Sequence, residues 1–198
     1  MPKTQKIKDR SFAWIKSVNL ILASFTSFYI LLSFTLVNYE ASFILAFTSV
    51  SMLFMSFVQL ISGFMEFNIR SIYRKINVIT GAIVVALSIT TLFKPVLTDA
   101  WITRIFGFGL VTLGSVRFLF SILIKKYVRF YRIASLFAGL ICVTIGLIIA
   151  IIHGIPLRTQ LNIVSLGFLA LVILRFLFGY SGRDVYVDGE SKNEKDDK

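Results

Sequence analysis

The chain has 198 residues, of which 57% are hydrophobic and only 16% are charged. Ordinary soluble domains are about 45–50% apolar and about 25% charged, so the composition excludes a typical soluble protein and favours one surrounded mostly by lipid. The net charge of +11 would suit a nucleic-acid-binding protein, but the basic residues gather at the ends of apolar runs, and we therefore predict no nucleic-acid partner.

Six apolar runs follow one another along the chain, and each is long enough to cross a bilayer as a helix. They are Val18–Val37, Phe43–Phe64, Ile76–Phe93, Ile102–Ile124, Ile133–Ile152 and Leu161–Tyr180. A hydrocarbon core about 30 Å thick needs roughly 20 helical residues. No run shows the alternation of a β-barrel wall, and a helix satisfies its own backbone polar groups in lipid. The sequence therefore predicts an all-α membrane protein with six transmembrane helices.

The first run follows a basic segment, residues 1–16, and could be mistaken for a signal peptide. A signal peptide has an apolar core of about 7–15 residues and a small-residue cleavage site after it. Val18–Val37 is longer, and no such site follows it. We therefore expect it to be retained as the first helix of a single transmembrane domain, residues 17–180.

Basic residues lie mainly on one side of the predicted membrane. That side carries Lys3, Lys6, Lys8, Arg10, Lys16, Arg70, Arg74, Lys75, Lys125, Lys126, Arg129 and Arg132, whereas the other carries Lys94 and Arg158. Short loops rich in Lys and Arg stay in the cytoplasm, so both termini are predicted to be cytoplasmic. The basic side should also attract anionic lipid. The polar tail, residues 181–198, has nothing to bury and is expected to be disordered.

A shift of 58 residues aligns the sequence with itself. Arg-Phe-Leu-Phe occurs at Arg117–Phe120 and again at Arg175–Phe178, and Gly81 and Gly139 also coincide. We therefore predict three tandem helical hairpins, at about residues 16–73, 74–131 and 132–180. Such copies would be related by an axis along the membrane normal.

Small or polar residues recur at matching positions of the three predicted hairpins. They are Asn19 and Ala23, Asn77 and Gly81, and Ser135 and Gly139 on the outgoing helices, and Ser51, Gly109 and Gly167 on the returning helices. A spacing of four places each pair on one helix face. Small residues let backbones approach, and Asn or Ser can hydrogen-bond across helices. We therefore assign these residues to helix packing.

Arg117 and Arg175 lie within apolar runs, and Gln59 holds the matching position in the first hairpin. Arg104 lies near the outer end of its run. A central arginine costs about 2.5–3.5 kcal/mol to insert, and two interpretations stay open. Each arginine either anchors its helix to lipid phosphates, or faces the bundle axis with Gln59 and binds an anion such as a lipid phosphate or a carboxylate. Because the apolar runs offer no acidic partner, an unpaired inward arginine is expected to need an external anion.

No sequence motif indicates catalysis. The chain has no HExxH, GxSxG or Walker A motif, no Cys/His cluster, and no relay of acidic residues within a run. Its one cysteine, Cys142, cannot form an internal disulfide and is expected to behave as a small apolar residue. The sequence therefore predicts no enzymatic activity, no cofactor and no metal.

The stretches Ile76–Pro95 and Gly107–Ile122, echoed in the third hairpin, resemble the HdeD family of acid-resistance membrane proteins. The likeness lies in glycine-punctuated hairpins and in prolines of the outer turns. It covers most of the membrane region but neither tail, and the first hairpin departs from it, with Ala23 and Ser51 in place of glycine. The resemblance implies a prokaryotic plasma (inner) membrane protein linked to acid or envelope stress.

Three functions stay open at this point. The first is a non-enzymatic, HdeD-like membrane protein that binds anionic lipid or a membrane partner. The second is an accessory subunit of a larger membrane complex, packed through Ser, Thr and Gly faces. The third is a small-solute transporter or channel, which the lack of membrane acids makes less favourable.

Overall fold

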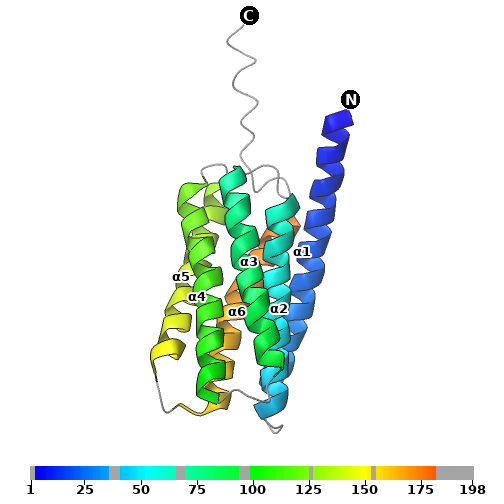
Figure 1. Ribbon diagram of the computed structural model, residues 1–198. Coiled ribbons are helices and arrows are strands. Elements are labelled where there is room, and N and C mark those ends of the chain that lie inside the picture. The colour runs from blue at the N-terminus through cyan, green and yellow to red at the C-terminus, as the bar shows by residue number, and fades with distance from the viewer. Residues whose placement is uncertain are drawn as a thin grey trace, which may run out of the picture.

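The computed structural model describes residues 3–35, 41–65, 70–93, 99–124, 127–152 and 155–181, which form a bundle of six α-helices (Figure 1). They are α1 (Lys3–Thr35), α2 (Ala41–Met65), α3 (Ser71–Leu92), α4 (Asp99–Leu123), α5 (Arg129–Ile151) and α6 (Leu157–Ser181). Each helix is long and apolar enough to cross a membrane. The predicted all-α chain with six such helices is confirmed, and it indicates a multi-pass membrane protein.

Several helices begin before the apolar runs that predicted them. α3 starts at Ser71 rather than Ile76, and α5 at Arg129 rather than Ile133. The basic segment of residues 1–16 is not separate, since residues 3–16 form the start of α1, which projects beyond the other helices (Figure 1). Hydropathy marks the apolar part of a helix, whereas Lys and Arg continue it as good helix formers. The tail beyond Ser181 and the loop with Pro95 lie outside the described residues.

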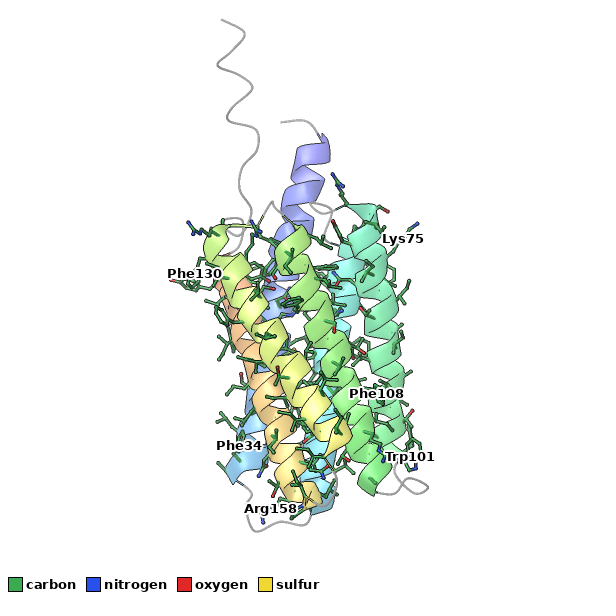
Figure 2. All side chains as sticks on the ribbon, turned by 90° about the vertical axis from the view of Figure 1, so that its left-hand side faces the viewer. Phe34, Lys75, Trp101, Phe108, Phe130 and Arg158 are labelled. Carbon is green, nitrogen blue, oxygen red and sulfur yellow. The ribbon has the colours of Figure 1, made fainter. Side chains whose placement is uncertain are left out.

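α2, α4 and α6 form the inside of the bundle, and α1, α3 and α5 form the outside. The inner helices contact one another, each outer helix packs against its neighbours along the chain, and α1 closes the ring against α6. In each inner helix 56% of the apolar window is buried, against 28–33% in the outer helices. Large apolar side chains cover the outward surface, as Phe108 does in Figure 2, and this surface suits contact with lipid.

Small residues on the inner helices accommodate large side chains from their inner neighbours. A Cβ added to Gly109 of α4 would lie 2.7 Å from Sδ of Met52 on α2, and one added to Gly167 of α6 would lie 3.1 Å from the side chain of Leu110 on α4. Ser51 of α2 is buried, and its hydroxyl donates to the Phe47 carbonyl 2.9 Å away. The centre of the bundle is therefore packed by interlocking side chains.

Each outer helix buries a stripe whose spacing alternates between four and three residues. The stripes are Asn19, Ala23, Thr26, Ile30 and Ser33 on α1; Asn77, Gly81, Val84, Ser88 and Thr91 on α3; and Ser135, Gly139, Cys142, Gly146 and Ile149 on α5, where Tyr131 and Ala138 are also buried. This is the a/d spacing of coiled coils. The sequence analysis recognised the first two positions of each stripe, and the heptad spacing would have revealed the remaining three.

At the α4–α5 junction, glycines let the backbones of the two helices approach each other closely. A Cβ added to Gly139 of α5 would lie 2.6 Å from the Phe118 nitrogen and 2.8 Å from the Gly114 oxygen of α4, and one added to Gly146 would lie 2.6 Å from the Gly107 oxygen. These neighbours are backbone atoms, which cannot swing aside. Any larger residue at Gly139 or Gly146 would therefore push the two helices apart.

Candidate functional site

Basic side chains near the start of the apolar spans of the outer helices donate to backbone carbonyls at the end of inner helices. Lys16 Nζ lies 3.3 Å from Tyr180 O, Arg74 Nε and Nη2 lie 3.1 and 2.7 Å from Gly63 O and Phe64 O, and Arg132 Nε lies 3.0 Å from Ser121 O. The last carbonyls of a helix lack an intrahelical partner, and a cation there also complements the helix dipole. The sequence analysis had treated these residues only as topology signals.

We call the end of the bundle that holds these three contacts the basic end. Figure 2 shows Lys75 and Phe130 at this end, and Trp101 and Arg158 at the opposite end. The exposed residues Arg70, Lys75 and Arg129 add further positive charge here. The charge asymmetry predicted along the sequence is therefore also an asymmetry in space.

Gln59, Arg117 and Arg175 are all buried near the basic end, with exposed fractions of 1%, 5% and 4%. Each lies six residues before the last residue of its inner helix, which is about 9 Å along the axis. The structure thus places both arginines inside the protein rather than on its lipid-facing surface.

Arg175 on α6 finds its partners on α1 and α2. Its Nη1 donates to Asn19 Oδ1 at 3.1 Å and to Ser62 Oγ at 3.4 Å. Neighbouring helices therefore supply neutral acceptors to Arg175. Asn19 had been assigned to helix packing, where an asparagine can hydrogen-bond across helices, and Ser62 had not been singled out.

Gln59 on α2 pairs with α3 in a similar way. Its Nε2 donates to Thr80 Oγ1 at 2.7 Å, and the Thr80 hydroxyl donates in turn to the Ile76 carbonyl at 2.7 Å. Asn77, one turn away, is buried, and its Oδ1 has no hydrogen-bond partner among the described residues. Gln59 is uncharged, so this junction needs no counter-charge.

Arg117 on α4 differs from both. Its Nη2 is fully buried and has no hydrogen-bond partner within the described part of the chain. The Ser135 hydroxyl of α5 donates to the backbone carbonyl of Arg117 at 3.3 Å, which is a contact to the backbone of Arg117 and not to its guanidinium. None of the six candidate spans contains an Asp or a Glu. Because an arginine stays protonated in proteins, Arg117 holds a positive charge in the interior without a carboxylate from its own spans.

A buried apolar cluster includes Val116, the residue before Arg117, and four of its eight buried members are aromatic. Phe120 of α4, Tyr131 of α5 and Phe178 of α6 belong to it, and the Tyr131 and Phe178 ring centroids are 5.8 Å apart. Apolar surroundings raise the cost of leaving the guanidinium uncompensated.

Arg104 lies apart from the other three predicted site residues. It is five residues into α4, at the opposite end, and its guanidinium carbon lies 5.4 Å from the centroid of the Trp101 ring. This distance is typical of a cation–π contact. The structure therefore does not bring Arg104 together with Gln59, Arg117 and Arg175.

Comparisons with protein-family models, with curated proteins and with solved structures found no match to this chain. Among the described residues, no group of three or more His, Cys, Asp or Glu is placed to hold a metal ion. Cys142 is buried, with Sγ 3.2 Å from the Gly167 carbonyl oxygen. The buried polar side chains near the basic end are therefore the part of the described structure that a function can be built on.

Proposed function

We propose that this protein is a non-enzymatic, HdeD-like protein of a prokaryotic plasma (inner) membrane that binds an anionic lipid near its basic end. The observation that carries the proposal is the buried guanidinium of Arg117, whose Nη2 lacks a hydrogen-bond partner among the described residues. An uncompensated charge in a protein interior costs several kcal/mol. Because arginine cannot shed its proton, an anion from outside the chain is the direct way to offset that cost.

Lipid phosphate is the anion that this position favours. Arg117 lies about 9 Å from the end of α4, close to the depth at which headgroups meet the hydrocarbon core. The exposed basic residues at this end would concentrate anionic lipid around the bundle. An arginine fork also matches two phosphate oxygens at once.

The lipid content of the purified protein tests this proposal. We expect anionic lipid to be enriched in wild-type protein, relative to the membrane extract, and lost from the double variant Arg117→Ala/Arg175→Ala. Arg104→Ala is the matched control, because it removes an arginine at the opposite end, and it should keep the lipid. Extraction in mild detergent followed by lipid mass spectrometry measures all three proteins. Unchanged lipid in a folded double variant would contradict the proposal.

The same preparations address the other functions. A protein present in stoichiometric amount would favour an accessory subunit, and solute flux in proteoliposomes would favour a transporter or channel. The HdeD resemblance extends the proposal to acid or envelope stress, which survival of a deletion strain at low pH tests.

We also propose that the bundle is built from three tandem hairpins with both termini in the cytoplasm. The contacts of Lys16, Arg74 and Arg132 support the repeat, because the three basic residues are 58 positions apart and each donates to the end of an inner helix. The buried stripes of the outer helices support it too, because their five positions match in steps of 58. The excess of Lys and Arg at the basic end supports the orientation.

Cysteine labelling in intact cells tests the orientation. In a Cys142→Ala background, we expect Trp101→Cys to react with a membrane-impermeant maleimide and Lys75→Cys to react only after lysis. Both positions are exposed and lie at opposite ends (Figure 2). The reverse pattern would mean that the basic end faces outward.

A further inference from the structure

We propose that the anion binds at Arg117 alone, as one phosphodiester group per chain, and that Ser135 is the residue that leaves Arg117 available for it. The inference rests on the proposed function and narrows it to one of the two buried arginines. It follows from a difference between the hydrogen-bond acceptors that neighbouring helices supply to Arg175 and those that they supply to Arg117.

The first difference lies on the adjacent outer helix. Arg175 donates to the amide oxygen of Asn19 on α1. In steps of 58, the position of Asn19 corresponds to Asn77 on α3 and to Ser135 on α5. The serine side chain is shorter, and its hydroxyl donates to the backbone carbonyl of Arg117. Position 135 therefore contacts the backbone of Arg117, and Nη2 of Arg117 has no hydrogen-bond partner among the described residues.

The second difference lies on the next inner helix. Arg175 also donates to the hydroxyl of Ser62 on α2. Two steps of 58 lead from Ser62 to Phe178 on α6, a buried aromatic side chain with no acceptor. The positions of Asn19 and Ser62 are thus both replaced in the setting of Arg117, where Nη2 has no hydrogen-bond partner among the described residues.

The chemistry of the site favours an anion with a single charge. Arg117 contributes one positive charge, and none of the spans contributes a negative one. A phosphodiester carries one negative charge and presents two oxygens to the fork. A doubly charged inorganic phosphate would leave a net charge buried, which is costly.

The sharpest test keeps Arg117 and gives it the partner that Arg175 has. In Ser135→Asn, an amide oxygen should pair with Nη2 and compete with the anion, as Asn19 does for Arg175. We expect delipidated wild-type protein to bind one phosphatidylglycerol per chain by native mass spectrometry, and Ser135→Asn to bind it at least tenfold more weakly. Ser135→Thr keeps the hydroxyl and is the control, which should bind like wild type.

A thermal measurement separates this role from simple packing. Phosphatidylglycerol should raise the Tm of wild-type protein, whereas Ser135→Asn should have a higher Tm without lipid and a smaller rise with it. Phosphatidylcholine and inorganic phosphate should leave both proteins unchanged. A Tm rise with inorganic phosphate would overturn the lipid as the source of the anion.

The outcomes of these experiments distinguish a failure of this inference from a failure of the proposed function on which it rests. If wild-type protein binds phosphatidylglycerol no better than phosphatidylcholine, the proposed function fails. If wild-type protein binds it but Ser135→Asn binds it equally well, the function stands and the inference is overturned. Should Ser135→Asn fail to fold, Arg117→Gln and Arg175→Gln decide the same question, because Gln59 already occupies the matching position on α2. Loss of lipid from Arg175→Gln alone would overturn the inference.

Discussion

The α4–α5 and α1–α6 junctions each join an outer helix to an inner one, yet they are held together in different ways. At α4–α5, Gly107, Gly114, Gly139 and Gly146 bring the two backbones into direct contact. At α1–α6, side chains form the links. Lys16 reaches the Tyr180 carbonyl, Asn19 accepts from Arg175, and Ser33 and Ser165 share a hydrogen bond at 3.3 Å. Arg132 and Ser135 also donate to backbone carbonyls of α4, so the difference is that backbones touch at α4–α5, whereas side chains bond to side chains at α1–α6.

The difference shows what close packing does to a buried arginine. On α1, an asparagine long enough to cross to α6 satisfies Arg175. On α5, the glycine-rich stripe includes the shorter Ser135, and Arg117 keeps a nitrogen without a partner among the described residues. The same side chain is thus a structural link in one junction and a candidate binding group in the other. The neighbouring helix decides between these roles.

The largest effect that we expect comes from filling the packed junction. Gly139→Ala places a Cβ against the Phe118 nitrogen and the Gly114 oxygen, so α4 and α5 must separate. We expect the free energy of unfolding to fall by about 2–3 kcal/mol, measured by thermal or denaturant unfolding in detergent. Gly167→Ala is the matched control, because its Cβ would meet side chains and no backbone atom, with Leu110 at 3.1 Å and Ile145 at 3.7 Å. Equal losses in the two variants would show that backbone contact does not hold this junction.

The sequence predicted the helices well because the number and length of apolar runs determine them directly. It also predicted that the two members of each pair, Asn19 with Ala23, Asn77 with Gly81 and Ser135 with Gly139, would share one helix face, since a spacing of four is local. The junctions were harder. Asn19 and Arg175 are 156 residues apart, and their contact depends on α1 closing the ring against α6, which no local pattern specifies.

The environment of the arginines could not be predicted from the sequence for a related reason. A long side chain near a helix end can extend to the headgroups or turn inward, and the choice depends on how each helix is rotated in the bundle. A further signal lay in Lys16, Arg74 and Arg132, because these basic residues are spaced by 58. That spacing could have predicted their contacts with the ends of the inner helices.

Replacing either arginine should change the free energy of unfolding by less than Gly139→Ala does, and the two replacements should not change it in the same direction. Arg175→Met removes two hydrogen bonds, and we expect it to lower the free energy of unfolding by about 1 kcal/mol, since hydrogen bonds between membrane helices are worth about 0.6 kcal/mol each. Arg117→Met should leave the stability of delipidated protein unchanged or raise it, because an apolar side chain of similar length replaces an uncompensated charge. The free energies of unfolding of both variants, measured in the same detergent, test this difference.

When phosphatidylglycerol is added, wild-type protein should become more stable than Arg117→Met, because only the guanidinium can bind the lipid phosphate. If Arg117→Met destabilises the delipidated protein as much as Arg175→Met does, then Arg117 is already satisfied by its own helices and the two junctions do not differ in the way that their hydrogen bonds indicate.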